Sequence, residues 1–189
     1  MAADHPFIEL RTPRLVLRRF RPSDAPAFQE YRADPDVARY QSWDTTYSPE
    51  DADTFMRSVA QASPGAPGEW FQFAAISATT GILVGDIGLR TDPTASGLVE
   101  LGITVSPSHQ NQGYATEMAA AVIDYAFDRL AATTIRAITD TRNDPSIRLL
   151  ERLNFQLKET TESVFKGAPC QEHTYELQAL PNKGSTREA

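Results

Sequence analysis

Residues Gln110 to Ala115 read "QNQGYA" and lie between a strand-like segment and a helix-like segment. The first amides of a helix have no partner within the helix, and the helix dipole favours negative charge there. Gly113 would let an anion approach the backbone closely because glycine has no Cβ. The segment therefore predicts a phosphate-binding loop, or alternatively an ordinary loop whose glycine allows tight packing. The lysine-bearing and dinucleotide-binding glycine motifs are both absent from the sequence.

The helix after Gly113 must hold this loop in place. Its apolar residues recur at steps of three and four and indicate one buried face: Ala115, Met118, Ala119, Val122, Ala126 and Leu130. The preceding segment, "LVELGITV" (98–105), is typical of a strand. We therefore expect the loop at the end of this strand, with the helix packed on the sheet.

The remaining elements predict a mixed sheet. We expect seven strands, at about residues 14–20, 69–77, 82–90, 98–105, 134–140, 155–165 and 171–180. Helices are expected after residue 21 with an interruption at Pro35, from Ser48, from Gly113, and from Asp144 to Leu153. Consecutive strands pair antiparallel, and the strand–helix–strand order after Leu98 implies one parallel crossover. The fold class is α+β, with one domain over residues 1–180 and a frayed tail over residues 181–189.

Composition narrows the class of protein. The chain has 189 residues, 41% of them hydrophobic, and a net charge of −7, which disfavours nonspecific binding to nucleic acid. No apolar run approaches the roughly 20 residues of a membrane span, and we expect a cytoplasmic protein without membrane contact. The single cysteine, Cys170, has no disulfide partner and no metal ligands at useful spacing, so we expect no metal.

Longer stretches carry a family resemblance. "QNQGYA" resembles the (Gln/Arg)-x-x-Gly-x-(Gly/Ala) signature of the GNAT acyltransferase superfamily. "LRTPRLVLRRFRPSDAPAF", "GYATEMAAAVIDYAFDRL" and "RNDPSIRLLERLNF" are similar to segments of its RimJ/RimL-like branch, the ribosomal-protein N-terminal acetyltransferases. The resemblance implies a GNAT fold with a splayed pair of parallel strands. It also implies acetyl transfer from acetyl-CoA to a primary amine, with a protein N-terminal α-amine favoured, by direct attack in a ternary complex.

The resemblance also assigns cofactor-binding residues. The strand end, the loop and a later asparagine would contact acetyl-CoA, through Ile103, Thr104, Val105, Gln110, Asn111, Gln112, Gly113, Tyr114, Ala115, Thr116 and Asn143. Relatives often place Arg or Lys just before the glycine, where this chain has Gln112. His109 is the only ionisable side chain in the loop, so we expect backbone amides to bind most of the diphosphate.

Two catalytic roles follow from the same resemblance. Glu100 occupies a strand position where relatives carry an acid, and it is either the general base or a solvated surface residue; Asp86 is a second candidate that more readily fits a structural role. Relatives carry a tyrosine that protonates the leaving thiolate where this chain has Leu150. Ser146, one turn from Leu150, is the expected donor instead, unless it is only a hydroxyl of the helix's first turn.

Two alternatives to a protein acetyltransferase remain open. A small amine such as an antibiotic or polyamine could be the acceptor, and the acceptor loops do not decide between the two. A noncatalytic acyl-CoA-binding module would also fit Leu150 and the loop without basic residues. Self-association as a homodimer is conceivable through the C-terminal strands.

Overall fold

The structure, a computed structural model, describes residues 9–180. One sheet of eight strands runs through this part, in the order β1-β2-β3-β4-β5-β6-β8-β7. All neighbouring pairs are antiparallel except β5 and β6. The strands are β1 (Glu9–Arg11), β2 (Leu15–Arg19), β3 (Trp70–Ser77), β4 (Leu83–Thr91), β5 (Leu98–Val105), β6 (Thr134–Asp140), β7 (Gln156–Phe165) and β8 (Ala168–Gln178). The mixed α+β fold is thus confirmed.

The expected number of seven strands is wrong by one. The missed strand, β1, has only three residues and pairs with β2 through Leu10 and Leu17. Three residues are too few to display the alternation of apolar and polar side chains that identifies a strand. The tail expected at residues 181–189 lies outside the described residues.

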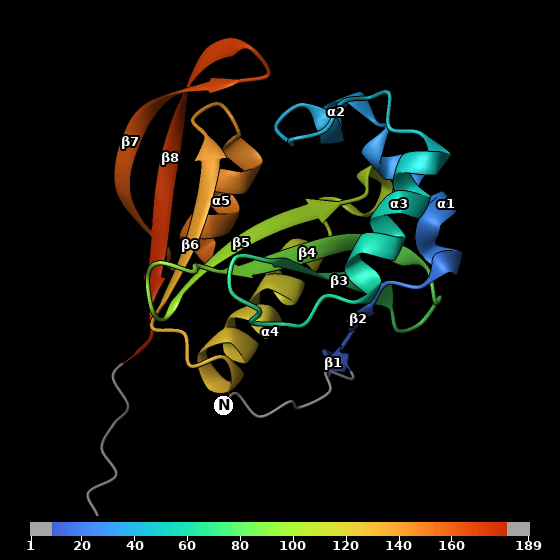
Figure 1. The fold of residues 1–189 in the computed structure, drawn as a ribbon, viewed down its shortest axis with the longest axis horizontal. Coiled ribbons are helices and arrows are strands. Elements are labelled where there is room, and N and C mark those ends of the chain that lie inside the picture. Colours follow the sequence, from blue (N-terminus) through green and yellow to red (C-terminus); the bar gives the residue numbers. More distant parts are fainter. Residues whose placement is uncertain (1–8, 181–189) are drawn as a thin grey trace, which may run out of the picture.

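Helices cover both faces of the sheet (Figure 1). They are α1 (Ala25–Arg32), α2 (Pro35–Ala38), α3 (Pro49–Ala60), α4 (Tyr114–Arg129) and α5 (Asp144–Arg152). On one face, α4 packs Met118, Val122 and Ala126 into the main core, and α5 adds Leu150. On the other face, α1 to α3 enclose a second core around Phe28. Within residues 9–180, no helix is long and apolar enough to cross a bilayer.

The helix starts follow local sequence. Ser48 caps α3 by accepting a hydrogen bond from the amide of Asp51, and Pro49 occupies the first helical position. The expected break at Pro35 is confirmed, because α1 ends at Arg32 and α2 begins at Pro35 behind the capping side chain of Asp34. The short α2 therefore begins a loop that continues to α3.

β5 and β6 separate after a short contact, as expected from the family resemblance. They pair only through Leu98–Thr134, Val99–Ile135 and Glu100–Arg136. In Figure 1 the two strands diverge from this point, and β6, β7, β8 and α5 form a separate wing. The fold thus leaves a gap that opens at the end of β5, directly before α4.

Candidate active site

A cavity of about 820 Å³ fills the gap between the separated strands. Its walls are the end of β5, the loop before α4, the end of β6, the first turns of α5 and the segment from α2 to Gln41. All the expected cofactor-binding residues except Gln112 line it: Ile103, Thr104, Val105, Gln110, Asn111, Gly113, Tyr114, Ala115, Thr116 and Asn143. The structure therefore brings these residues together in one place.

The loop before α4 presents a row of unpaired amides to this cavity. A short 3-10 turn, Pro107–His109, precedes the loop, and Asn111 and Gly113 adopt left-handed φ values of 58° and 81°. No acceptor within residues 9–180 receives a hydrogen bond from the amides of residues 111 to 116. Such a run of free donors at a helix N-terminus is suited to bind an anion.

Arg14 contacts this loop from the turn before β2. Its guanidinium donates to the carbonyl oxygen of Gln112 at 2.9 Å and lies 4.6 Å from the ring centre of Tyr114. Its Nε also pairs with the carboxylate of Glu117 at 2.6 Å. A Cβ on Gly113 would come within 3.3 Å of this guanidinium. The positive φ of Gly113 favours glycine at this position, and a larger residue would also crowd the Arg14 guanidinium. These two reasons add to the one expected from the sequence, which is access of an anion to the backbone.

Glu117 completes the contact between the two segments. It accepts hydrogen bonds from the hydroxyl of Thr12 at 2.6 Å and from the backbone amide of Arg14 at 2.8 Å. Partial burial acts to raise the pKa of Glu117, but the hydrogen bonds from Thr12 and Arg14 outweigh it and hold this pKa below its ordinary value. These contacts attach the first turn of α4, and with it the preceding loop, to the turn before β2.

Four arginines line the cavity and were missed in the sequence: Arg39, Arg142, Arg148 and Arg152. Arg148 and Arg152 stand one turn apart on α5 and line the cavity, and Arg152 donates to the hydroxyl of Thr116 at 3.4 Å. Their spacing of four residues was visible in the sequence, but the packing of α5 beside the start of α4 was not. The basic residues that the loop itself lacks are therefore supplied by α5 and, behind the loop, by Arg14.

The end of β5 directs backbone groups into the gap. Ser106 donates to the carbonyl of Val84, so in this antiparallel ladder the even-numbered residues of β5 bond to β4 and the odd-numbered ones face away. The carbonyl oxygens of Ile103 and Val105 accept from Gln41 at 3.5 Å and Gln110 at 3.1 Å. Their N–H groups face the same gap and are available to a ligand.

The first turn of α5 places Ser146 at the opposite wall. Asn143 caps this helix by accepting from the amide of Ser146 at 3.3 Å, and both residues line the cavity. Leu150 is only 4% exposed and packs in the main core, although it also borders the cavity. Within the described part of the chain no group is hydrogen-bonded to the Ser146 hydroxyl, so it can act on a group in the cavity, whereas Asn143 already has a structural role.

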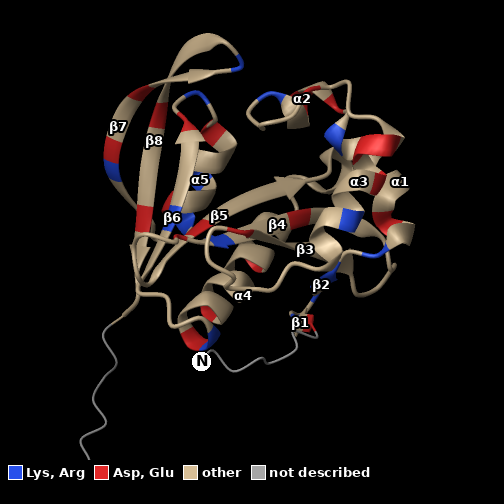
Figure 2. Ribbon diagram, viewed as in Figure 1, with Lys and Arg blue, Asp and Glu red and all other residues tan. Residues whose placement is uncertain are grey.

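Glu100 lies at the closed end of the gap. Its carboxylate pairs with Arg90 at 2.6 Å, and it is not among the residues that line the cavity. It belongs to a row of neighbours across the sheet, Arg90, Glu100, Arg136 and Glu176, in which basic and acidic residues alternate (Figure 2). Glu100 is therefore held outside the cavity by its ion pair with Arg90.

Asp86, the second acid considered, is buried beneath α1. It is 2% exposed, accepts a hydrogen bond from Tyr31, and pairs with Arg32 at 3.2 Å. Burial raises the pKa of Asp86, while the charge of Arg32 and the bond from Tyr31 oppose the rise. The Arg32 guanidinium in turn stacks 3.6 Å from the ring centre of Trp43. These contacts give Asp86 a structural role.

The hairpin of β7 and β8 reaches across to the loop after α2. Lys166, in the hairpin turn, donates to the carbonyl oxygens of Ala38 at 3.0 Å and Trp43 at 2.6 Å, and pairs with Asp44 at 3.1 Å. From the same loop, Tyr40 donates to the carbonyl of Arg142 at 3.1 Å. These contacts form a bridge that joins the hairpin and the turn after β6 to the loop after α2. The bridge lies at the end of the cavity opposite the loop before α4.

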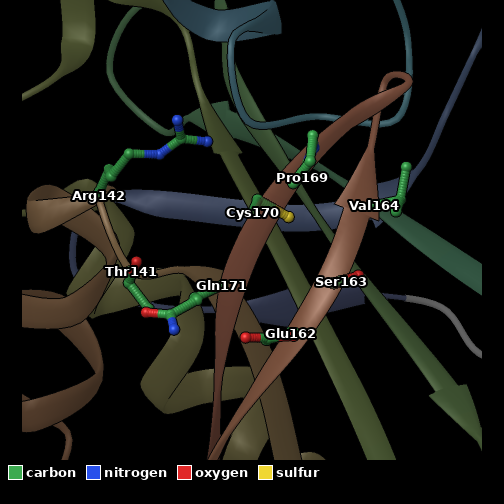
Figure 3. A pocket seen from close by; sticks show the side chains of 8 residues that line it. All are labelled: Thr141, Arg142, Glu162, Ser163, Val164, Pro169, Cys170 and Gln171. Carbon is green, nitrogen blue, oxygen red and sulfur yellow. The ribbon is translucent and has the colours of Figure 1, made fainter.

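A second hollow, of about 770 Å³, lies between the turn after β6 and the β7–β8 hairpin (Figure 3). Arg142, Glu162 and Cys170 are among its lining residues. It is shallow and open, and within the described residues none of the expected cofactor-binding residues lines it. The cavity between β5 and β6 is therefore the better candidate for the reaction site.

The chain is similar to known acetyltransferases. Residues 14–156 match the acetyltransferase (GNAT) domain family. The uncharacterized N-acetyltransferase p20 of Bacillus licheniformis is 30% identical over 147 residues, which cover 78% of this chain and 82% of that protein. YoaA of Bacillus subtilis, also an uncharacterized N-acetyltransferase, is 27% identical over 170 residues, which cover 89% of this chain and 95% of that protein.

Solved structures have the same fold. A GNAT-family acetyltransferase from Bacillus anthracis superposes with a TM-score of 0.80 at 25% identity, covering 90% of this chain and 98% of that one. Mycobacterium smegmatis RimJ in complex with CoA-disulfide gives 0.77 at 19% identity, covering 90% and 86%. Vibrio cholerae spermidine N-acetyltransferase in complex with CoA and spermine gives 0.76 at 17%, covering 88% and 96%. The protein described here, matched over most of its length, belongs to the GNAT acetyltransferase family.

Proposed function

We propose that this protein transfers the acetyl group of acetyl-CoA to a primary amine, with the N-terminal α-amine of a protein as the favoured acceptor. One observation supports the proposal above others. Asn111 and residues 113 to 116, whose amides are unpaired, line the same cavity as Ile103 and Val105, whose N–H groups face inward. The diphosphate of acetyl-CoA needs donors of the first kind. Its pantetheine and thioester, which follow along the cavity, need donors of the second kind.

The cofactor would lie along the gap. The diphosphate would bind the amides around Gly113, and Arg148 and Arg152 on α5 would add positive charge beside the loop. The pantetheine amides would pair with the backbone of Ile103 and Val105 in place of the missing part of β6. The amide of Ile103 or Val105 would then stabilise the negative charge that develops on the thioester oxygen.

The chemistry needs a proton removed from the amine and a proton given to the thiolate. In the proposed reaction the neutral amine attacks the thioester carbon, a C–N bond forms, and the C–S bond breaks with release of CoA. Ser146 would donate the proton to the sulfur. Glu100 would accept the amine proton through a water, because its own carboxylate is held by Arg90 outside the cavity. A base has a modest task here, since a terminal α-amine has a pKa of about 7.7–8.0.

The preference for a protein N-terminus rests on the resemblance of the chain's segments to the RimJ/RimL-like branch and on the shared fold with RimJ. The spermidine acetyltransferase has the same fold, so a small amine is the second candidate. The contacts of Lys166 and Tyr40 at the acceptor end of the cavity do not distinguish an extended N-terminus from an aliphatic amine.

The test has two steps. Thermal unfolding with CoA or acetyl-CoA should show stabilisation that grows with ligand concentration. Release of free thiol from acetyl-CoA should then depend on an added amine, tested with peptides and with small amines. Stabilisation by CoA without thiol release on any acceptor would favour a noncatalytic acyl-CoA-binding module. Absence of both effects would overturn the proposal.

The role of Glu100 has its own test. If Glu100 is the base, Glu100→Gln should lower turnover about a hundredfold or more and change its dependence on pH. An unchanged pH profile would remove Glu100 from the mechanism and leave its ion pair with Arg90 as its role.

A further inference from the structure

We infer that Glu172 binds a positively charged group of the acceptor other than the amine that reacts. The inference rests on the proposed function and narrows its acceptor to a dication: a diamine, or an N-terminus followed by a basic residue. Glu172 lies on β8, lines the cavity, and is half-buried.

Three acids on the same face of the sheet as Glu172 are neutralised. Glu100 pairs with Arg90, Glu176 with Arg136 at 3.0 Å, and Asp140 with Arg142 at 2.6 Å. Glu172 is the direct cross-strand neighbour of Asp140 on β6, so its side chain lies on the same face. Among residues 9–180, however, none forms an ion pair or side-chain hydrogen bond with Glu172.

Three cations near this end of the cavity are already paired: Arg39 with Asp36 at 3.3 Å, Arg142 with Asp140, and Lys166 with Asp44. Arg142 binds both carboxylate oxygens of Asp140, at 2.8 and 2.6 Å, and this bidentate contact holds the pKa of Asp140 below its usual value. Lys166 donates to Ala38 and Trp43 and pairs with Asp44. The charge of Glu172 therefore remains uncompensated in a partly enclosed site, where a bound cation gains more than it would in open water.

The walls beside Glu172 fit the carbon chain of such a ligand. Tyr40 and Phe165 line the cavity at this end, together with Ile138, which is 46% exposed. Aromatic and aliphatic surface beside a carboxylate suits a methylene chain that ends in an ammonium group.

The experiment compares acceptors that differ only in the second charge. Butylamine and 1,4-diaminobutane form one pair, and short peptides with norleucine or lysine at the second position form the other. The wild-type protein should favour the dication in kcat/KM by about tenfold or more, because hydrogen bonds to charged groups are strong. Glu172→Gln should remove this preference through KM, and the pair with the larger preference identifies the source of the natural acceptor.

Glu162→Gln is the matched control. Glu162 lies on the same hairpin, and its substitution removes the same charge. Of the two cavities, Glu162 lines only the second hollow. It should leave the preference intact, and Glu172→Asp should retain part of it. Equal preference in wild type and Glu172→Gln, or equal loss in Glu162→Gln, would overturn the inference while thiol release still supports the proposed function. Absence of thiol release with every amine would instead defeat the proposed function itself.

Discussion

Arg14 and Glu117 are 103 positions apart in the sequence, yet the backbone amide and the guanidinium of Arg14 bind both carboxylate oxygens of Glu117. The same guanidinium holds the carbonyl of Gln112. The turn before β2 and the first turn of α4 are therefore joined directly behind the loop proposed to bind the diphosphate. This contact gives the N-terminal segment "RTPRL" a part in shaping the site, which its position in the sequence alone would not suggest.

Replacing Glu117 with glutamine should destabilise the protein by about 1–3 kcal/mol, because a largely buried acceptor of charged hydrogen bonds is lost. The pKa of Glu117 is lowered in the folded state, so the unfolded state binds more protons between the two pKa values and the carboxylate stabilises the fold above about pH 4.3. This contribution is lost as pH falls through the lowered pKa.

Urea unfolding of wild type and Glu117→Gln between pH 3 and pH 7 checks both points. The difference in unfolding free energy should be largest at neutral pH and shrink in acid. Glu9→Gln, which removes the partner of the exposed Arg11, should change stability by less than about 1 kcal/mol. A difference that stays constant over this pH range would contradict the role given to the Glu117 carboxylate.

Gly113→Ala should weaken CoA binding as well as stability. A left-handed φ of 81° costs an alanine about 1–2 kcal/mol, and the added methyl group would press on the Arg14 guanidinium that holds the loop. Gly81→Ala is the control, because Gly81 has a φ of 73° but no atom within 4 Å of the added Cβ. Gly81→Ala should lose only the stability that its φ costs and Gly113→Ala at least as much, whereas calorimetry should show weaker CoA binding only for Gly113→Ala.

Ser146→Ala should lower turnover more than affinity for CoA. Asn143 accepts a hydrogen bond from the backbone amide of residue 146, and alanine keeps this amide. The helix cap is therefore retained and only the hydroxyl is lost. Loss of a general acid lowers the rate by about 10²–10⁴-fold. Steady-state kinetics beside CoA titration separates the effects, and an equal loss in both would show that Ser146 serves only binding.

Asp86→Ala should destabilise the protein by about 3–5 kcal/mol, because Arg32 would remain buried without a partner. Asp36→Ala, which breaks an exposed pair with Arg39, should change stability by less than about 1 kcal/mol. Thermal unfolding measures both. A small effect for Asp86→Ala would mean that the buried Arg32 finds another acceptor.

Much of the fold was readable from local pattern. The bounds of β5 and β6 matched the predicted segments, and the Ser48 cap and the break at Pro35 were visible as single residues. The expected loop lies between the end of β5 and the start of α4, with Gly113 directly before the helix. These features depend on neighbours in the sequence, which is why the sequence contained them.

The missing parts depend on contacts between distant segments. Gln112 suggested that the loop lacks positive charge, but Arg14 and Arg152 come to it from other elements. The sequence left Glu100 as either a general base or a solvated acid, and it did not show the ion pair that Glu100 forms with Arg90. The bridge through Lys166 joins residues 123 and 128 positions apart, and no periodicity records such a contact.

The junction of β5 and β6 rests on three residue pairs, Leu98–Thr134 to Glu100–Arg136. Hydrogen bonds of the sheet therefore connect its two wings at one end only, while Lys166 ties them at the far rim. A ligand whose amides filled the open ladder would serve as a surrogate strand and join the wings along their full length. Saturation with CoA should then slow amide hydrogen exchange in β6 and β8 as well as in β5. Binding of CoA in the cavity would thus protect backbone amides in both wings of the sheet.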